Sequence, residues 1–435
     1  MTAKKRINIL QFICHDLGRE LGCYGNEAIA SPNIDALAAR GVLFRQHYAA
    51  ATPCSPARVC QMTGMYCHSA GLMGLTNRGW DTPVERQTII DYLNAAGYET
   101  YHFGLQHERK DGSANRYKHE LGGPASVQEA TSRLMEFLSS DAAKAGPWYA
   151  NIGTGEVHLP FDRAHYTFAD PEKVKVPPYL PDNADVRLEL ARFHGAIRFM
   201  DDWIGRLVEA LQRTGLAENT LLIFTTDHGA AFPRAKSTLY DPGIGTALVM
   251  LPPESMGIGP RVCDELISNI DVTPTLLEMI GEEIPAAVQG RSFWPLLAGE
   301  KYERRGEIFS EKNFHDCYDP MRCVRIERYK YIRSFEHDKV RNMAMPQDIR
   351  RSIASNELRA DALAPRPPEE LYDLQTDPAE ENNLAGEAAL KNVRDDLAGR
   401  LERWMRETND FLPGPMPTPP PEQPLDPFGV KTEKC

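Results

Sequence analysis

The sequence predicts an α/β fold in which helices cover both faces of a mostly parallel central sheet, followed by a smaller α+β domain. Strand-like and helix-like segments alternate over the first 300 residues, which is typical of a parallel sheet with helical crossovers. Most polar clusters directly follow the predicted strands, where the sites of open α/β sheets lie. After about residue 300 the alternation gives way to a hairpin-like pattern.

Local signals justify the elements of the first domain. Gly41 and Gly97 follow apolar helical patterns and are expected to end helices, and Ser126 with Glu129 predicts a capping box. In chain order we expect strand 7–14, helix 31–41, a helix and a strand within 88–104, helix 126–138, strand 147–158, a long helix near 184–212, buried strand 220–229 and helix 271–281.

The rest of the chain has a different character. A hairpin is predicted within 321–335, a strand and turn within 370–385, and an amphipathic helix over 387–408. The proline-rich end is expected to be an extended tail. The sequence therefore predicts a catalytic domain over residues 1–300, an α+β subdomain over 301–411 and a tail over 412–435.

Composition narrows the classes of partner. The 435 residues carry a formal net charge of −12, so nucleic acid and long polyanions are poor candidates and an anionic ligand is expected to be small. Nine cysteines without C-x-x-C spacing argue against a zinc ribbon or a disulfide scaffold. No segment has the pattern of a signal peptide or a membrane span, so we expect a cytoplasmic protein that binds no membrane.

The stretch ATPCSPARVC (51–60) predicts an anion site. Pro56 suits the first turn of a helix, which places Cys54 just before a helix N-terminus, where free amides and the helix dipole favour negative charge. Arg58 adds a planar cation near the same end. The alternative is a buried structural cysteine beside a helix start.

Two polar pairs end apolar strands and predict a metal site. His15 and Asp16 follow the first strand, and Asp227 and His228 follow strand 220–229. Carboxylates that a sheet brings together at its edge commonly hold a divalent cation, which would polarise an anionic ester. Loop solvation and helix capping are the alternative role of these residues.

Three single residues extend this hypothesis. His107 and His158 are candidate proton carriers, because histidine titrates near neutral pH. Lys236 is a candidate anion-binding cation, with a solvated loop lysine as the alternative.

A further polar cluster precedes the hairpin. His315, Asp316 and Arg322 lie within the stretch HDCYDPMR. They are predicted to form the wall of a substrate pocket, and a network at the junction of the two domains is the alternative.

The string CSPARVCQMTG (54–64) resembles the signature of the formylglycine-dependent sulfatases of the alkaline phosphatase superfamily. The matching residues are Cys54, Pro56, Arg58, Thr63 and Gly64, whereas Ala57 replaces the usual serine. Further blocks that look like the family are HDLGRELGCYGN (15–26), YCHSAGL (66–72), HLPF (158–161), TTDHG (225–229), KSTLYDPG (236–243), QGRSFWPLL (289–297) and ELYDLQTDPAEENNL (370–384). The resemblance spans nearly the whole chain and implies an alkaline-phosphatase-like sandwich.

This resemblance implies the chemistry of Cys54. In the family a formylglycine-generating enzyme converts the signature cysteine to an aldehyde, which becomes hydrated. One hydroxyl attacks sulfur, and the covalent sulfo-enzyme then releases sulfate as the second hydroxyl loses its proton. A thiol or a plain serine could not regenerate itself in this way.

The resemblance also implies roles for the other residues. The metal site would comprise His15, Asp16, Cys54, Asp227 and His228. Arg58 would stabilise the aldehyde hydrate, with His68 near it; His107 and Lys236 would bind the sulfate group, and His158 would act at the leaving group.

Three departures from the family pattern bear on the metal and the anion. His15 stands where sulfatases usually carry a first aspartate, and His228 stands where they often carry asparagine. Calcium is the family's usual ion, but two imidazoles could favour Mn²⁺ or Zn²⁺. Leu105 replaces a lysine that usually binds sulfate.

Within the family, the blocks HDCYDPMRCVR and ELYDLQTDPAEENNL look most like the N-sulfoglucosamine sulfohydrolases, the sulfamidases. The resemblance therefore implies hydrolysis of the sulfate ester or sulfamate of a small sulfated sugar. Two alternatives stay open: a phosphate or phosphonate monoester hydrolase on the same scaffold, and a non-catalytic homologue that binds a metal and a sulfated ligand.

Overall fold

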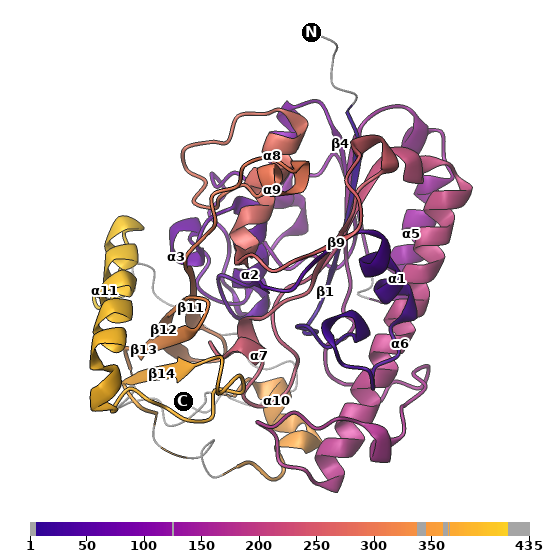
Figure 1. Cartoon of the computed structure of the whole chain (residues 1–435). Helices are drawn as coiled ribbons and strands as arrows, with labels where there is room; N and C mark the ends of the chain where they lie inside the picture. The colour runs from indigo at the N-terminus through magenta and orange to yellow at the C-terminus, as the bar shows by residue number, and fades with distance from the viewer. Residues whose placement is uncertain (1–5, 124–125, 337–344, 360–363, 365, 416–435) are drawn as a thin grey trace.

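The computed structural model describes residues 6–123, 126–336, 345–359, 364 and 366–415 (Figure 1). Its centre is an eight-stranded sheet with strand order β5-β4-β6-β1-β7-β8-β2-β9. In that order the strands are His119–Gly122, Glu99–Gly104, Trp148–Gly153, Asn8–Cys14, Thr220–Thr226, Leu248–Leu251, Val42–Phe44 and Arg261–Cys263. Among these described strands only β8 runs antiparallel to its neighbours, so the predicted mostly parallel sheet is confirmed.

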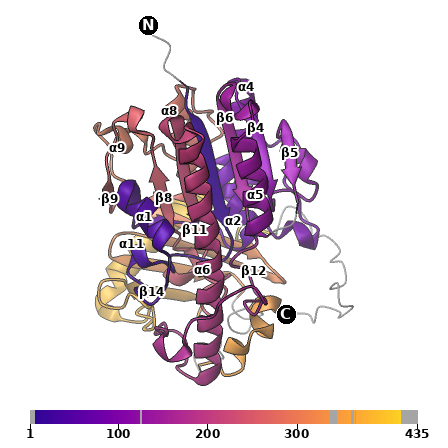
Figure 2. The same ribbon diagram turned by 90° about the vertical axis from the view of Figure 1, so that its right-hand side faces the viewer.

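Helices cover both faces of this sheet (Figures 1 and 2). On one face α1, α5 and the long α6 share a hydrophobic core with the sheet, and on the other face α4 and α8 do so. The helices of this region are α1 Pro32–Arg40, α2 Cys54–Thr63, α3 Cys67–Ala70, α4 Ile89–Ala95, α5 Val127–Leu138, α6 Ala184–Arg213, α7 Asp241–Ile244, α8 Val272–Ile280 and α9 Trp294–Ala298. The predicted α/β/α sandwich is therefore confirmed. None of the helices in the described ranges has both the length and the apolar character that crossing a bilayer would need.

The two central strands fix where the polar pairs lie. Every residue of β1 and β7 is buried, because neighbouring strands and both helical layers enclose them. The strands run parallel and in register from Asn8 opposite Thr220 to Cys14 opposite Thr226. The residues that follow them therefore leave the sheet side by side, at its carboxyl edge.

A four-stranded antiparallel sheet, in the order β11-β12-β13-β14, forms the predicted α+β region, and α11 packs on it (Figure 1). The elements of this region are β11 Ile308–Phe314, β12 Tyr318–Arg325, β13 Tyr329–Ser334, β14 Glu369–Asp373, α10 Gln347–Arg351 and α11 Lys391–Glu407. A separate two-stranded parallel sheet pairs β3 His47–Tyr48 with β10 Ile267–Ser268. The predicted hairpin, β12–β13, and the amphipathic helix, α11, are confirmed. The boundaries at residues 300 and 411 stay predictions, and the tail lies outside the described residues from 416 onward.

Backbone hydrogen bonds join β11 to the segment just before Cys54. The amide of Glu311 in β11 donates to the carbonyl of Ala50 at 2.9 Å, and the amide of Thr52 donates to the carbonyl of Glu311 at 3.1 Å. The C-terminal sheet thus holds the segment that leads into helix α2.

The predicted capping box at Ser126 is wrong. The side chain of Ser126 makes no capping hydrogen bond; instead the amide of Val127 donates to the buried carboxylate of Glu156 at 2.7 Å. A carboxylate from a distant loop satisfies the helix N-terminus better than the local serine does. This bond ties α5 to the loop that carries His158.

A buried histidine in α6 predicts acid sensitivity. His194 is 4% exposed and its Nδ1 has no partner among the described residues, and burial lowers its pKa to about 4. In the unfolded chain the pKa of this histidine is about 6.5, so between pH 6.5 and pH 4 the unfolded state binds more protons than the folded state does. The stability that neutral His194 contributes is therefore fully present above about pH 6.5 and is lost as the pH falls toward 4. Between pH 7 and pH 5 we expect the unfolding free energy, measured by urea unfolding, to fall by about 2 kcal/mol less in His194→Gln than in the wild type. The exposed His165→Gln is the control, and equal pH slopes in all three proteins would contradict the assignment.

Candidate active site

Five side chains from three places in the sequence meet at the carboxyl edge of the sheet. They are His15, Asp16, Cys54, Asp227 and His228, all buried, and one ligand atom from each lies within 4.8 Å of the others. The first two follow β1, the last two follow β7, and Cys54 is the first residue of α2. The structure therefore brings together all the residues that the sequence predicted as metal ligands.

Asp16 lies at the centre of this cluster. Its Oδ1 is 2.7 Å from Nδ1 of His15, 3.1 Å from Nε2 of His228 and 3.8 Å from Sγ of Cys54. Its backbone amide donates to Oδ1 of Asp227 at 3.0 Å. Asp16 adopts a φ of 50°, a left-handed conformation that aspartate tolerates better than most residues and that turns the chain sharply after the strand.

Backbone carbonyls fix the orientation of two imidazoles. Nδ1 of His228 donates to the carbonyl of Gly229 at 3.0 Å, so its unprotonated Nε2 faces the cluster, 3.0 Å from Sγ of Cys54. Nδ1 of His158 donates in the same way to Leu159 at 2.6 Å. Burial lowers the pKa of His228 and, together with Lys236, lowers the pKa of His158 to about 4. Both rings are neutral at pH 7.

Two buried cations balance the carboxylates. Nε of Arg58 donates to Oδ2 of Asp227 at 3.1 Å, and Nζ of Lys236 donates to Oδ2 of Asp16 at 2.6 Å. Burial alone would raise the pKa of Asp16, but Lys236 and His15 outweigh it and hold that pKa well below its usual range. Asp16 and Asp227 are therefore ionised.

The cluster fits a divalent cation. Two ionised carboxylates and two imidazoles, none exposed by more than 3%, form a donor set of oxygen and nitrogen that suits Ca²⁺, Mn²⁺ or Zn²⁺. Beside it, Nη2 of Arg58 and Nδ1 of His107 are buried without a partner among the described residues. Unsatisfied buried polar atoms of this kind are costly, so they indicate a place where an anionic or hydroxylated group binds.

The Cys54 thiol is protonated at neutral pH. Burial raises its pKa well above the usual value, and the nearby carboxylates Asp16 and Asp227 add to this, while Lys236 opposes it. A protonated thiol is a poor nucleophile and a poor metal ligand. The unmodified thiol is therefore a weak nucleophile at this position.

One residue of the site, Asp348 in α10, was not among those predicted from the sequence. Its Oδ2 lies 2.6 Å from Nζ of Lys236 and 3.4 Å from Nε2 of His158, and Lys236 also donates to that Nε2 at 3.1 Å. Asp348 therefore borders the predicted leaving-group residue. No motif marks it, because α10 is a five-residue helix without a detectable apolar period.

Asp316, with His315 beside it, contacts the start of α10. Oδ2 of Asp316 accepts from the amide of Gln347 at 2.6 Å and its Oδ1 accepts from Arg78 at 2.9 Å, while His315 lies 3.3 Å from Asp316. These contacts hold the start of α10 against the catalytic domain. The geometry favours the domain-junction alternative for this pair.

Arg322 and His68 lie in a second buried cluster. His68 bonds Glu311 at 2.9 Å, and Arg322 binds Asp410 at 2.6 Å and Glu311 at 3.4 Å. Arg322 also donates to the carbonyls of Lys312 and Met321, so all five of its donors are used and it is fully buried. Arg322 is therefore structural, contrary to its expected contact with substrate, and the contacts found for His68 do not tie it to Cys54.

Removing Arg322 is expected to destabilise the fold. Arg322→Met would leave Glu311 and Asp410 buried without their cation, which costs about 3–5 kcal/mol. Arg333→Met, in the adjacent strand, is the control: it removes an exposed pair with Glu402 and should cost less than about 1 kcal/mol. Urea unfolding measures both, and a loss below about 1 kcal/mol for Arg322→Met would contradict the role given to the cluster.

A site with ionised carboxylates, imidazoles and buried cations at the carboxyl edge of an α/β/α sheet defines a hydrolase of anionic esters. A sequence profile described as Sulfatase matches residues 8–282, and a second, described as N-sulphoglucosamine sulphohydrolase, C-terminal, matches residues 231–351. The chain belongs to the sulfatase family and is a sulfuric ester hydrolase.

Two relatives illustrate this membership. The chain is 28% identical to an ulvan-active sulfatase of Formosa agariphila, over 93% of this chain and 76% of the relative. It is also 28% identical to the N-sulphoglucosamine sulphohydrolase of Homo sapiens, over 93% and 90% of the two chains.

Solved structures share the fold at low sequence identity. A Bacteroides thetaiotaomicron protein of glycosaminoglycan metabolism superposes with a TM-score of 0.77 at 19% identity, over 93% of this chain and 97% of the other. The phosphonate monoester hydrolase of Agrobacterium radiobacter superposes with a TM-score of 0.73 at 21% identity, over 93% and 96%. The alkaline-phosphatase-like sulfatase fold is therefore confirmed.

Proposed function

We propose that this chain hydrolyses the sulfamate or sulfate ester of a small sulfated sugar that resembles N-sulfoglucosamine. One observation carries the proposal: Cys54, in the signature that precedes formylglycine, lies within hydrogen-bonding range of His228 and 3.8 Å from Asp16, at the predicted metal site. The family match and the sugar-sulfate names of the relatives support it.

Conversion of Cys54 to formylglycine would supply an aldehyde hydrate, one hydroxyl for attack on sulfur and one for release of sulfate. A divalent cation held by Asp16, Asp227 and His228, with His15 and residue 54 beside them, would polarise the sulfuryl oxygens. The converting enzyme is a separate partner that supplies its own oxidant.

The chain's own cations orient the anion. Arg58, held by Asp227 at 3.1 Å, keeps Nη2 available for the hydrate or a sulfuryl oxygen. Lys236, at 2.6 Å from both Asp16 and Asp348, contributes a fixed ammonium, and His107 offers an unpaired Nδ1. Together they replace water around the anion with preorganised donors.

His158 and Lys236 are the residues that we propose to act at the leaving group. Nε2 of His158 accepts from Lys236 at 3.1 Å and is neutral at pH 7. Burial opposes the charge of Lys236, but Asp16 and Asp348 raise its pKa well above the usual value, so it stays an ammonium. This ammonium, with His158 beside it, can donate a hydrogen bond to the departing atom, which takes its proton from water as the bond to sulfur breaks.

The proposal is tested by two measurements on protein from its native host. The tryptic peptide 46–58, QHYAAATPCSPAR, should show the mass loss of thiol-to-aldehyde conversion. The same preparation should release sulfate from N-sulfoglucosamine faster than it releases phosphate from glucosamine 6-phosphate. An unmodified thiol with no sulfate release would overturn the proposal.

A phosphate or phosphonate monoester hydrolase is the second candidate. His15 and His228 in the donor set, and Leu105 in place of the usual lysine, favour it. Preference for the phosphate ester over the sulfate would decide for it. A third candidate is a non-catalytic homologue, which predicts metal and sulfated-ligand binding without turnover of either substrate.

We also propose a cytoplasmic location. The cysteines around the site, Cys14, Cys54, Cys60 and Cys67, are free thiols, as in a reducing compartment. Fractionation of host cells tests this.

A further inference from the structure

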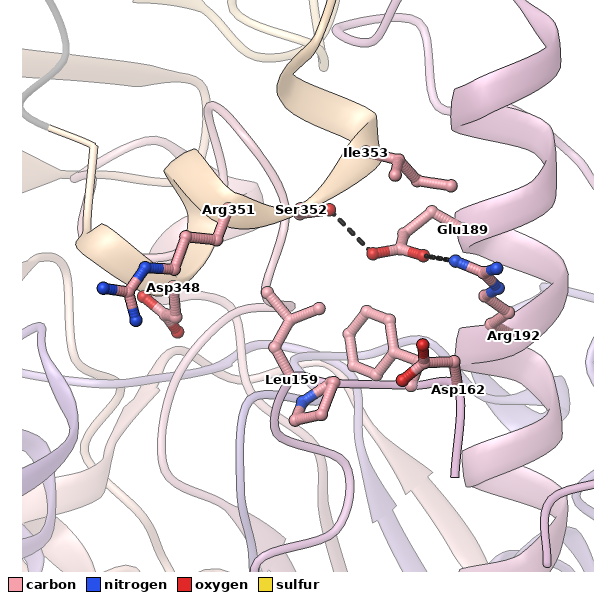
Figure 3. A pocket seen from close by; sticks show the side chains of 10 residues that line it. Leu159, Asp162, Glu189, Arg192, Asp348, Arg351, Ser352 and Ile353 are labelled. Atoms are coloured by element: carbon pink, nitrogen blue, oxygen red, sulfur yellow. Dashed lines mark hydrogen bonds and ion pairs between the residues drawn. The ribbon is translucent and has the colours of Figure 1, made fainter. Parts of the chain in front are cut away.

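A cavity of about 380 Å³ is lined by Leu159, which follows His158 in the chain, and by Asp348, which contacts His158 (Figure 3). It is bounded by the loop that follows His158, by α6 and by α10, and its size is in the range of small-ligand sites. Leu159, Phe161 and Ile353 give it an apolar wall against which one sugar ring can pack. It therefore has the place and size to hold the group that leaves sulfur.

The carboxylates at this cavity are not equivalent. Glu189 is occupied, because Ser352 donates to its Oε1 at 2.8 Å and Arg192 donates to its Oε2 at 3.2 Å (Figure 3). Asp162 lies on the exposed rim. Asp348 alone of the three contacts the catalytic cluster, through Lys236 and His158.

The two carboxylate oxygens of Asp348 have different surroundings. Its contacts with Lys236 at 2.6 Å and with His158 at 3.4 Å both end on Oδ2. No partner of Oδ1 is found in the described part of the chain, and the side chain is 21% exposed. A carboxylate oxygen beside the leaving-group residues is thus available as a hydrogen-bond acceptor.

We propose that Asp348 determines specificity for a nitrogen leaving group, so that the cavity takes an amino sugar N-sulfate in preference to the O-sulfate. This inference rests on the proposed function. The bridging nitrogen of a sulfamate carries a hydrogen that Oδ1 can accept, whereas the bridging oxygen of a sulfate ester carries none and turns lone pairs toward the carboxylate. The match of residues 231–351 to the sulphohydrolase C-terminal profile includes both Lys236 and Asp348.

The products favour the same choice. Cleavage of the S–N bond leaves the electron pair on nitrogen, which takes up protons, so that R–NH–SO₃⁻ and water give R–NH₃⁺ and SO₄²⁻. The leaving group thus becomes a cation beside Lys236, and a nearby carboxylate offsets their repulsion. An O-sulfate gives a neutral hydroxyl, which gains less from Asp348.

The test uses two substrates that differ at one atom. N-Sulfoglucosamine and glucose 2-sulfate place nitrogen or oxygen at the same ring position. We expect the wild type to favour the sulfamate, and Asp348→Asn to lower the ratio of the two kcat/KM values at least about 10-fold, because the introduced amide can donate to the ester oxygen. The ratio is the readout, since loss of the Lys236 partner would slow both reactions. Asp162→Asn is the matched control and should leave the ratio unchanged.

Each other outcome overturns the inference. Equal loss on both substrates in folded Asp348→Asn protein would mean that Asp348 acts only by holding Lys236. A wild type that prefers glucose 2-sulfate would overturn the specificity while the sulfatase function stands. Turnover of neither substrate by protein with converted Cys54 would overturn both the inference and the proposed sugar substrate.

Discussion

Cys54→Ala is expected to abolish turnover, with a loss of at least about 10⁴-fold in kcat, and to leave the fold intact. The substitution keeps Cβ but removes the thiol whose oxidation and loss would turn that carbon into the aldehyde, so the nucleophile of the covalent step cannot form. Its structural cost is small: Cys54 is buried, but alanine deletes one sulfur atom, at about 1 kcal/mol.

Sulfate release and urea unfolding measure the two parts of this prediction. Cys60→Ala is the matched control, because Cys60 is a fully buried cysteine in the same helix that does not belong to the cluster. It should keep its activity and lose similar stability. Residual turnover in Cys54→Ala above the background of a mock preparation would show that the nucleophile lies elsewhere.

The second large effect is expected for Asp227→Asn, which should lose metal and activity together. Asp227 contributes a carboxylate that is held ionised by His15, His228 and Arg58, despite burial that opposes it. An amide lacks this charge, so metal affinity should fall at least about 100-fold and kcat/KM should fall with it.

Metal content is measured by mass spectrometry after equilibration with Ca²⁺, Mn²⁺ or Zn²⁺ in turn, which also identifies the preferred ion. The control is Asp201→Asn, a buried aspartate whose oxygens accept from the amides of Asn33 and Ile34 at the start of α1. It should retain the metal. Unchanged metal content in Asp227→Asn would remove this residue from the site.

The sequence predicted the sandwich and the metal cluster because both follow from short-range signals. Predominantly apolar runs that end in His15-Asp16 and Asp227-His228 indicate central parallel strands, and parallel strands bring their ends to one edge. The signature around Cys54 then added the helix start that faces the same edge. The catalytic roles of these residues stay predictions.

What the sequence could not predict depends on tertiary contacts. Asp348 reaches Lys236 only because Asp316 and Arg78 hold a helix too short for a periodic pattern. Arg322 lies on a strand, where alternation cannot distinguish a buried ion pair from a pocket wall. Ser126 has the local sequence of a helix cap, but Glu156, a residue from a distant loop, accepts the hydrogen bond of the Val127 amide.

The bonds between β11 and the segment before Cys54 have a consequence for how the protein is made. The folded chain hides Cys54, at 2% exposure, so the proposed conversion requires the converting enzyme to reach this residue before the region folds. Glu311, which pairs with Ala50 and Thr52, is translated 311 − 54 = 257 residues after Cys54. At about 5–20 residues per second, the ribosome needs roughly 13 to 50 s to reach it. Synthesis itself thus leaves the cysteine open for a set interval, and faster translation or slower conversion would increase the share of chains that fold around an unconverted thiol.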